Sequence, residues 1–581
     1  MKILFNNHKL LTSVWNSRKL GGSVLHAVRL FTSLNLSEFE AINRGDKEVP
    51  KYFNFAEDVL DKWSKIEKDG GRPHHPALWW IDGKGGELKW SFENLGFVSR
   101  KAANVLAGSC GLQRGDRVIL ILPRIPEWWI LTVACIRAGI IFIPGTPLLT
   151  AKDIEYRLQV SKAKGVITND SLAPVVETVS SACPSLQTKL LLSEGRREGW
   201  QHFKELFEAA PSSHNSVQTR SDDPMLIYFT SGTTGSPKMV EHSQTSLALG
   251  MALTGRYWLD FKPSDVMWNI SDTGWVKGSM GGIFGPWLRG TSLFIHRMPQ
   301  FDPKEILNTL SNYPVTTMCA APTVYSMMVQ QDLPSYTFKS LSHCLSSGEP
   351  MNLDIMSQWE KETGLRIYQG YGQTEVGMII ANEKAKPAKP GSMGTATPNY
   401  DVQIIDEDGK ILPPGEEGDI AIRMKPKRPF SFFSHYVDNP EKNSAVVRGN
   451  FYVTGDQGWM DEDGYFWFTG RSDDIIISSG YRIGPFEVEN ALIEHPAVVE
   501  SAVVSSPDTI RGEVVKAFVV LSPEFASHNP EKLTRELQDH VKKVTAPYKY
   551  PRKMEFVQEL PKTVSGKIRR NELRKQEWGQ I

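Results

Sequence analysis

Short apolar runs alternate with helical patterns through the first part of the chain. Runs that suit buried strands stand at 77–81, 117–122, 139–143 and 224–230. Between them, apolar positions at helical spacing predict helices over 52–64, 94–107 and 127–137. Strands that alternate with helices favour a parallel sheet with helices on both faces.

The pattern changes after about residue 395. Short strand-like runs at 401–405, 418–423 and 465–468 are separated by turn residues such as Asp408-Gly409 and Asp463-Gly464. Asp-Gly pairs between apolar runs are typical of hairpins. We therefore expect a small, mostly antiparallel β subdomain over about 396–472.

The last part of the chain has a third pattern, in which predicted strands and helices alternate again. Strands are predicted at 475–477, 498–504 and 514–521, and helices at 485–494 and 531–544. A charged turn, Thr469–Asp474, precedes them and has no apolar anchor, which suits a hinge. The predicted fold class is α/β. It comprises a large N-terminal domain of parallel and mixed sheets with helices (38–472, including the β subdomain) and a mobile small α/β C-terminal domain (473–581).

Composition limits the function classes. At 581 residues the chain is too long for one compact core. Lys+Arg and Asp+Glu both number 66, a balance that argues against nucleic-acid binding. No apolar run approaches the ~20 residues of a membrane span. Five scattered cysteines without a Cys-x-x-Cys pair indicate reduced thiols.

The first 37 residues differ from the rest. They hold five Lys or Arg residues and no acid, many Ser, Thr and Asn residues, and leucines and valines at near-helical spacing. This is the composition of a mitochondrial presequence, which we predict over residues 1–37. The alternative is an ordinary frayed terminus.

A glycine- and hydroxyl-rich loop, Thr230–Lys238, follows the strand at 224–230. Its glycines permit close approach of phosphate oxygens, and Lys238 adds a cation. It is not a Walker A loop, because Pro237 precedes the lysine. A helix expected from roughly 243 to 257 would complete the strand–loop–helix context of a phosphate site. The alternative is a flexible linker.

A second loop, Tyr368–Glu375, has the same character. Thr374 can bond a phosphate, and Glu375 can hold a Mg²⁺ that bridges phosphate oxygens. Taken alone, a structural turn explains this loop equally well. Farther on, Asp456 can accept two hydrogen bonds from a ribose diol and Arg471 can reach ribose or phosphate. A plain turn residue is the alternative for Asp456.

Three further features carry weaker signals. Trp275 follows a glycine and can wall an acyl pocket, although a lone tryptophan is more often core. Tyr548–Lys553 with Lys542 and Lys543 forms a basic patch that suits nucleotide phosphates or is simply a solvated face. His242 lacks an acid or serine partner in the sequence and is given no catalytic role. Lys567 gives a stronger signal than these three, because its Ser-Gly-Lys near the chain end offers a mobile cation to a developing anion and accompanies the loop Thr230–Lys238.

Five segments in order resemble the motifs of adenylate-forming enzymes. They are Thr230–Lys238, Tyr371–Glu375, Tyr452–Asp456, Gly470-Arg471 and Pro561–Lys567. Within that superfamily, Ser271–Lys277, Ile477–Pro485, Tyr52–Ala56 and Pro126–Trp129 resemble the medium-chain acyl-CoA synthetases, which are mitochondrial matrix enzymes. The resemblance extends from residue 40 to the C-terminus.

The resemblance implies a role for each matched residue. ATP binding falls to Thr230, Ser231, Gly232, Thr233, Thr234, Gly235, Ser236, Pro237, Lys238, Met239, Gln369, Gly370, Tyr371, Gly372, Gln373, Thr374, Asp456, Arg471, Arg482 and Lys567. CoA binding falls to Ser479, Gly480, Tyr481, Arg511, Lys542, Tyr550, Pro551 and Arg552. The acyl pocket falls to Trp275 and Thr374, the metal to Glu375, catalysis to Lys567, Thr374 and Glu375, and the hinge to Asp473.

The implied activity is ATP-dependent ligation of a medium-chain fatty acid to CoA through an acyl-adenylate, with Mg²⁺ as cofactor. Alternatives are a benzoate-type aryl acid as substrate, delivery of the acyl group to a carrier protein, a catalytically dead binding module, and a luciferase-like oxygenase. We expect a monomer or weak homo-oligomer in the mitochondrial matrix. The glycine-rich Gly278–Gly285 departs from the pattern of close relatives, which suggests a wider or more mobile acyl pocket.

Overall fold

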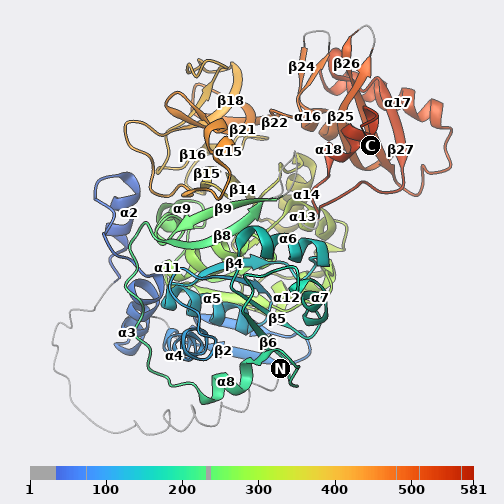
Figure 1. Ribbon diagram of the computed structural model, residues 1–581. Helices are drawn as coiled ribbons and strands as arrows, with labels where there is room; N and C mark the ends of the chain where they lie inside the picture. Colours follow the sequence, from blue (N-terminus) through green and yellow to red (C-terminus); the bar gives the residue numbers. More distant parts are fainter. Residues whose placement is uncertain are drawn as a thin grey trace.

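The computed structural model describes residues 34–72, 75–230, 237–478, 481–508, 511–563 and 566–580. All but the last four residues of the presequence predicted at 1–37 lie outside these ranges. The described strands form three sheets, and Figure 1 shows the third, in the C-terminal unit, set apart at the upper right.

The largest described sheet has fourteen strands. In spatial order they are β17 (Val402–Ile405), β18 (Glu417–Arg423), β21 (Phe451–Met460), β22 (Tyr465–Arg471), β16 (Gly394–Ala396), β15 (Gly377–Ala381), β14 (Ile367–Gln373), β13 (His343–Ser347), β12 (Thr317–Ala320), β10 (Val266–Asn269), β11 (Ser292–His296), β1 (Leu78–Ile81) and β2 (Glu87–Trp90), with β20 (Val447–Arg448) beside β21. Strands β14 through β1 are parallel, whereas β17 through β15 are antiparallel.

The two other sheets are smaller. The second runs β19 (His435–Tyr436), β9 (Lys238–Ser243), β8 (Pro224–Thr230), β4 (Ile141–Gly145), β3 (Arg117–Ile121), β5 (Gly165–Asn169), β6 (Thr188–Leu192) and β7 (Gln201–His202). The third runs β24 (Tyr481–Ile483), β23 (Ile476–Ser478), β26 (Gly512–Leu521) and β25 (Val498–Asp508), with β27 (Lys553–Val557) on β26.

Helices cover the sheets. Those of the large domain are α2 (Leu36–Arg44), η1 (Ala56–Asp61), α3 (Lys62–Lys68), α4 (Phe92–Asn104), η2 (Val105–Ser109), α5 (Pro126–Ala138), α6 (Ala151–Ser161), α7 (Ala173–Ser180), α8 (Phe203–Ala209), α9 (Met251–Tyr257), α10 (Val276–Ser279), η3 (Met280–Phe284), α11 (Gly285–Leu288), α12 (Pro303–Asn312), α13 (Pro322–Val329), η4 (Leu333–Ser335), α14 (Leu353–Thr363) and α15 (Pro440–Ala445). The C-terminal unit holds α16 (Pro485–Ile493), α17 (Pro530–Val544), η5 (Pro547–Lys549) and α18 (Arg570–Glu577).

Helix α5 shows how the sequence produces the core. Pro126 occupies its first position and Gly139 ends it in a left-handed conformation, the termini that favour a sharp start and stop. Nearly all its residues are buried, which explains why its sequence is apolar on every side. Strand β4, and strand β3 after its first residue Arg117, are likewise apolar and buried, as is typical of strands covered on both faces.

The predicted fold class is confirmed, but two local predictions were wrong. The second loop expected at Tyr368–Glu375 is mostly strand, because β14 extends to Gln373. A helix was expected from roughly 243, directly after the glycine-rich loop. Instead β9 follows the loop and pairs antiparallel with β8, with Thr230 opposite Lys238, and the helix begins only at Met251. The sequence of β9 carries no strand signal, because four of its six residues are polar and its apolar pair, Met239 and Val240, does not alternate with them. The loop therefore joins two strands rather than a strand and a helix.

The antiparallel part expected over 396–472 is continuous with the large sheet. β16 pairs with β15 on one side and with β22 on the other, so hydrogen bonds run from β14 into this part. Figure 1 shows it above β14 and beside the C-terminal unit. The boundaries at 396 and 472 stay predictions.

The glycine-rich Gly278–Gly285 is helical, and its glycines pack closely against neighbouring residues. It forms α10 and the π-turn η3. A Cβ at Gly278 would stand 2.6 Å from the Asp272 carbonyl oxygen, and one at Gly285 would stand 2.9 Å from Leu259 Cδ1. Close packing accounts for glycine at these two positions, and the expectation of a wider or more mobile acyl pocket stays a prediction.

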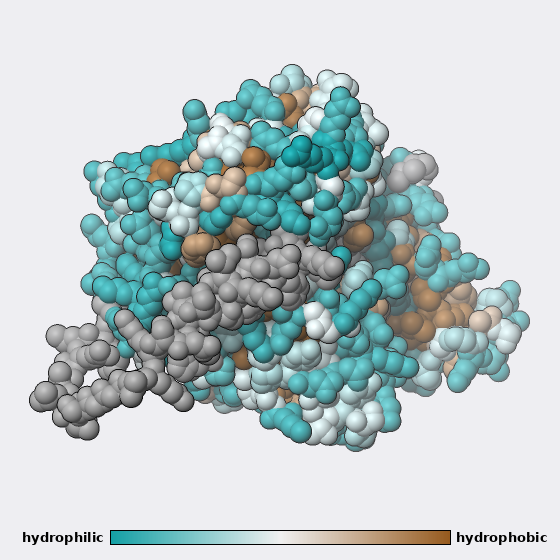
Figure 2. Space-filling view, turned by 90° about the horizontal axis from the view of Figure 1, so that it is seen from below, coloured by the Kyte–Doolittle hydropathy of each residue, from teal (hydrophilic) through white to brown (hydrophobic). Residues whose placement is uncertain are grey.

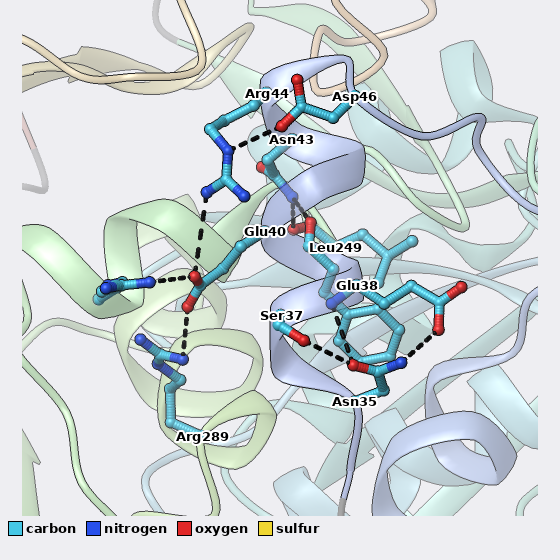
Figure 3. A network of polar contacts seen from close by, with 11 residues as sticks. Asn35, Ser37, Glu38, Glu40, Asn43, Arg44, Asp46, Leu249 and Arg289 are labelled. Carbon is cyan, nitrogen blue, oxygen red and sulfur yellow. Dashed lines mark hydrogen bonds and ion pairs between the residues drawn. The ribbon is translucent and has the colours of Figure 1, made fainter.

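Helix α2 is fixed to the domain by a buried carboxylate. Asn35 caps it by accepting from the Glu38 N–H, and Glu40 pairs with Arg289 at 3.0 Å and with Arg256 (Figure 3). Asn43 donates to the Leu249 carbonyl at 2.8 Å. The folded domain thus includes residues from Leu34, which is buried.

The surface is mainly hydrophilic on the face seen from below, with apolar side chains gathered toward its right edge (Figure 2). No described helix combines the length and apolar character that a membrane span requires. All five cysteines are buried and unpaired, which agrees with reduced thiols.

Candidate active site

The carboxyl ends of four neighbouring parallel strands define one edge of the large sheet. β14, β13, β12 and β10 are adjacent and parallel, so Gln373, Ser347, Ala320 and Asn269 end at the same side. Ligands of open α/β sheets bind beyond such an edge. Thr374 and Glu375, the part of the second loop that follows β14, lie at this edge.

Asp456 is the centre of a polar network at this edge. Its carboxylate is 4% exposed and accepts from the Tyr371 hydroxyl at 2.5 Å and from Gln373 Nε2 at 2.9 Å. Burial raises the pKa of the Asp456 carboxyl, while Arg471 works in the opposite direction. The structure thus brings together three residues predicted for ATP binding that are 85 positions apart at most.

Arg471 joins this network to the hinge turn. Its Nε lies 3.3 Å from Asp456 Oδ1 and 3.5 Å from Asp473 Oδ1. Burial opposes the charged guanidinium, but the two carboxylates outweigh it and the pKa of Arg471 is raised. A permanent cation therefore stands beside the proposed ribose-binding carboxylate.

One carboxylate oxygen of Glu375 accepts a hydrogen bond, and the other has no partner among the described residues. Tyr436 donates to its Oε1 at 2.8 Å, and burial raises the pKa of the Glu375 carboxyl. No group of three His, Cys, Asp or Glu side chains within the described ranges could hold a metal ion. A single carboxylate with a free oxygen fits Mg²⁺, which binds proteins through one or two carboxylates and takes substrate phosphates and water as its other ligands.

His242 contacts the backbone of the second loop. Its Nε2 lies 2.7 Å from the Thr374 carbonyl oxygen and its Nδ1 lies 3.0 Å from Ser246 Oγ. Because a carbonyl only accepts, Nε2 carries the proton. Burial lowers the pKa of His242 to about 4, so the ring is neutral near pH 7. The expectation that His242 has no catalytic role agrees with a ring that positions Thr374.

This histidine should make stability pH-dependent. Its pKa is about 4 when folded and ordinarily about 6.5, so the unfolded chain takes up a proton first as pH falls. Stability is then lost between about pH 6.5 and pH 4, by about 3 kcal/mol at most. Urea unfolding of the wild type and of His242→Gln across this range measures it. Parallel loss of stability in both proteins would contradict it.

The first loop is described only at its ends. Ser231, Gly232, Thr233, Thr234, Gly235 and Ser236 lie outside the described residues. Thr230 and Lys238 face each other across β8 and β9. Burial and Lys442 lower the pKa of Lys238, while Glu375 raises it, so the lysine lies within electrostatic reach of the second loop. The Met239 side chain is buried in the core, and the Pro237 carbonyl accepts from Tyr156.

The second loop owes its glycines to packing. A Cβ at Gly370 would stand 2.6 Å from Met378 Sδ, and one at Gly372 would stand 2.0 Å from the Gly377 carbonyl oxygen. Gln369 uses its side chain to accept from the Met351 N–H at 3.3 Å. These three residues position the strand end, and the polar side chains of Tyr371 and Gln373 carry its chemistry.

Lys567 stands near the network although it belongs to the C-terminal unit. It lies in a tight turn in which Thr563 N–H donates to the Lys567 carbonyl at 2.7 Å. Its positive charge lowers the pKa of both Asp456 and Lys277. The exposed lysine at the chain end therefore lies within electrostatic reach of both groups.

The predicted CoA-binding residues lie on the C-terminal unit. Lys542 Nζ stands 4.4 Å above the Tyr550 ring, and Arg552 donates to the Tyr550 hydroxyl at 2.7 Å. Tyr481 stacks on Tyr548 with centroids 4.3 Å apart. Pro551 is buried and Arg511 donates its N–H to Asp508 at 2.8 Å. Ser479, Gly480 and the Arg482 side chain lie outside the described residues.

Trp275 precedes α10 and keeps part of its surface accessible. Its neighbour Lys277 lies across the sheet edge, where Nζ donates to the Ser347 carbonyl at 2.9 Å. The sequence did not single out Lys277 by itself, nor Tyr436, because each partner is remote in the chain. The position of Lys277 two residues after Trp275, a predicted pocket residue, was the sequence signal that could have identified it.

Comparison with known proteins decides the family. The AMP-binding enzyme family matches residues 67–426, and the AMP-binding enzyme C-terminal domain matches residues 487–567. The chain is 64% identical to the Homo sapiens protein named acyl-coenzyme A synthetase ACSM4, mitochondrial, with 100% of each chain covered. It is 60% identical to the Mus musculus protein named acyl-coenzyme A synthetase ACSM3, mitochondrial, with 95% of each covered.

The chain belongs to the medium-chain acyl-coenzyme A synthetases of the AMP-binding enzyme family. The resemblance inferred from the five motifs is thereby confirmed. This acyl-coenzyme A synthetase also resembles solved structures. An anthranilate CoA ligase, AuaEII, solved with anthranoyl-AMP, superposes with a TM-score of 0.82 at 30% identity, covering 92% of this chain and 99% of that one. A benzoate CoA ligase from Burkholderia xenovorans gives 0.77 at 28%, covering 90% and 100%.

Proposed function

We propose that the protein joins a medium-chain carboxylic acid to CoA in two steps at the described sheet edge. The carboxylate attacks the α-phosphorus of ATP, giving an acyl-adenylate and pyrophosphate. The CoA thiol then displaces AMP and gives the acyl-CoA. Family membership supports an AMP-forming acid–thiol ligase that uses ATP and CoA as substrates.

The observation that carries the residue roles is the network around Asp456. Its buried carboxylate stands beside the permanent cation of Arg471 and within the field of Lys567. We assign Asp456 to the ribose hydroxyls and Lys567 to the carboxylate and α-phosphate. A substrate carboxylate is already ionised near neutral pH, so this step needs charge neutralisation more than a base.

Glu375 and the two loops are the groups that we assign to the phosphates of ATP. We assign Glu375 to Mg²⁺, because it keeps one carboxylate oxygen without a described partner. The metal would neutralise charge on the phosphates when bound. Thr230 and Lys238 face each other at the base of the first loop, which we assign to the β- and γ-phosphates.

The C-terminal unit must change position between steps. Arg574 donates to the Asp473 carbonyl, and to Asp474 Oδ1 at 3.0 Å, so contacts of α18 end at the proposed hinge. Tyr481 and the Lys542–Tyr550–Arg552 cluster lie on this unit and suit the CoA nucleotide. We propose rotation about Asp473, which exchanges Lys567 for the pantetheine channel at Ser479 and Gly480.

We place the protein in the mitochondrial matrix, as the names of its relatives suggest. The presequence predicted over 1–37 needs a shorter boundary. Removal of residues through 37 would delete Asn35, the cap of α2, and the buried Leu34. We propose a processing site before Leu34. N-terminal sequencing of protein purified from mitochondria tests it, and a first residue after Leu34, or an intact Met1, would contradict it.

An aryl acid is the second candidate substrate. The likeness to anthranilate and benzoate CoA ligases supports it, although their identity to this chain is about half that of the named mitochondrial relatives. Incubation of purified protein with ATP, CoA and either octanoate or benzoate tests both. Release of AMP and acyl-CoA with octanoate supports the proposal, and thioester formation with benzoate alone would favour the aryl alternative.

A further inference from the structure

Lys277 is a cation built into the edge of the sheet where the acid must bind. Asn269, at the end of β10, donates to the Lys277 carbonyl at 2.6 Å and fixes the backbone of α10. The side chain extends past β12 to the end of β13, where Nζ donates to the Ser347 carbonyl at 2.9 Å.

A glycine next to the Lys277 ammonium leaves room for it. Gly348 follows Ser347 with a φ of +102°, and a Cβ there would stand 2.7 Å from Lys277 Nζ. Any larger residue at 348 would therefore collide with the ammonium as well as strain the backbone. The position of the cation is determined by two strand ends and one glycine.

The ammonium keeps hydrogen-bonding capacity for a ligand. It has three donors, and within the described ranges only the Ser347 carbonyl accepts from it. Glu349 and Cys319 act on it electrostatically, but neither forms an ion pair with it among the described residues. The Lys277 side chain is largely buried, and part of its surface stays accessible.

Under the proposed function, the acid is activated beside Lys277. Lys567, assigned above to the substrate carboxylate, lies close enough for its charge to act on Lys277. Trp275, the expected pocket wall, is two residues away. An unbranched alkyl chain that passes Lys277 would leave two desolvated donors unmet, which costs binding free energy.

We propose that Lys277 is a specificity residue, and that the preferred substrate is a medium-chain carboxylic acid bearing a second oxygen function. A second carboxylate, a hydroxyl or an oxo group would accept from the two open donors. This inference rests on the proposed function. A site built to hydrogen-bond a substrate group discriminates strongly against the analogue that lacks it.

The test compares acids of equal length with purified full-length protein. Pyrophosphate release gives kcat/KM for octanoate, octanedioate and octanoates hydroxylated at successive carbons. The expected result is at least a tenfold higher kcat/KM for one oxygen-bearing acid than for octanoate, a modest part of what such sites achieve. Equal or lower values for every oxygen-bearing acid would overturn the inference.

Variants separate specificity from structure. Lys277→Met should lose the preference, with octanoate rising and the oxygen-bearing acid falling, whereas Lys277→Arg should retain it. Lys339→Met, which changes an exposed lysine of the same domain, is the matched control. Equal loss for both acids in Lys277→Met would overturn the proposal. If that variant does not fold, the wild-type panel and Lys277→Arg still decide. Absence of thioester with every acid would instead contradict the proposed function.

Discussion

Replacement of Lys567 by alanine is expected to lower the rate of acyl-adenylate formation by about a hundredfold to a thousandfold. The charge of Lys567 lowers the pKa of both Asp456 and Lys277, and this lysine is the one proposed to contact the substrate carboxylate and the α-phosphate. Loss of such a preorganised cation removes stabilisation of charge that develops on the phosphate. The second step should be spared, because the proposed rotation about Asp473 removes Lys567 from the site before CoA arrives.

Two assays on the same variant separate the steps. Pyrophosphate release with octanoate and ATP reports adenylation, and thioester formation from supplied octanoyl-adenylate and CoA reports transfer. Lys575→Ala, an exposed lysine on α18, is the matched control and should leave both unchanged. Equal loss of both activities in Lys567→Ala would contradict a lysine that acts in one step only.

Replacement of Asp456 by asparagine should impair both steps. The carboxylate is expected to bind the ribose, which is present in ATP and in the acyl-adenylate alike. Hydrogen bonds to a charged group contribute about 1.5–3 kcal/mol each, so the KM for ATP should rise about tenfold to a hundredfold. Arg471 would lose one of its two carboxylate partners.

The measurement is the KM for ATP in pyrophosphate release, together with the KM for acyl-adenylate in thioester formation. Asp463→Asn, in the exposed turn between β21 and β22, is the control. Thermal unfolding distinguishes lost binding from a weakened fold. An unchanged KM for both nucleotides, in a stably folded Asp456→Asn, would remove Asp456 from the ribose site.

The sequence predicted elements well where periodicity and termini agreed. β8 runs from Pro224 to Thr230 as expected, and α5 differs from its predicted range by one residue at each end. The strand β9 was missed because four of its six residues are polar and no apolar alternation marks it as a strand. Pairing with β8, and not local preference, makes it a strand.

The candidate site was predictable as a set of residues but not as a network. Motifs named Tyr371, Gln373, Asp456 and Arg471, yet nothing local shows that the first two donate to Asp456. Tyr436 and Lys277 carry no motif of their own, and their partners Glu375 and Ser347 are far away in the chain. Such contacts arise only when the strand ends are brought to one edge.

The most direct test of the central claim follows the oxygen atoms of the acid. Octanoate labelled with ¹⁸O in both carboxylate positions is incubated with the purified protein, ATP and CoA, and the products are analysed by mass spectrometry. If the carboxylate attacks the α-phosphorus and CoA then displaces AMP, the AMP carries one ¹⁸O atom, the octanoyl-CoA carries the other, and the pyrophosphate carries none. AMP without label, or label in pyrophosphate or inorganic phosphate, would contradict the acyl-adenylate route.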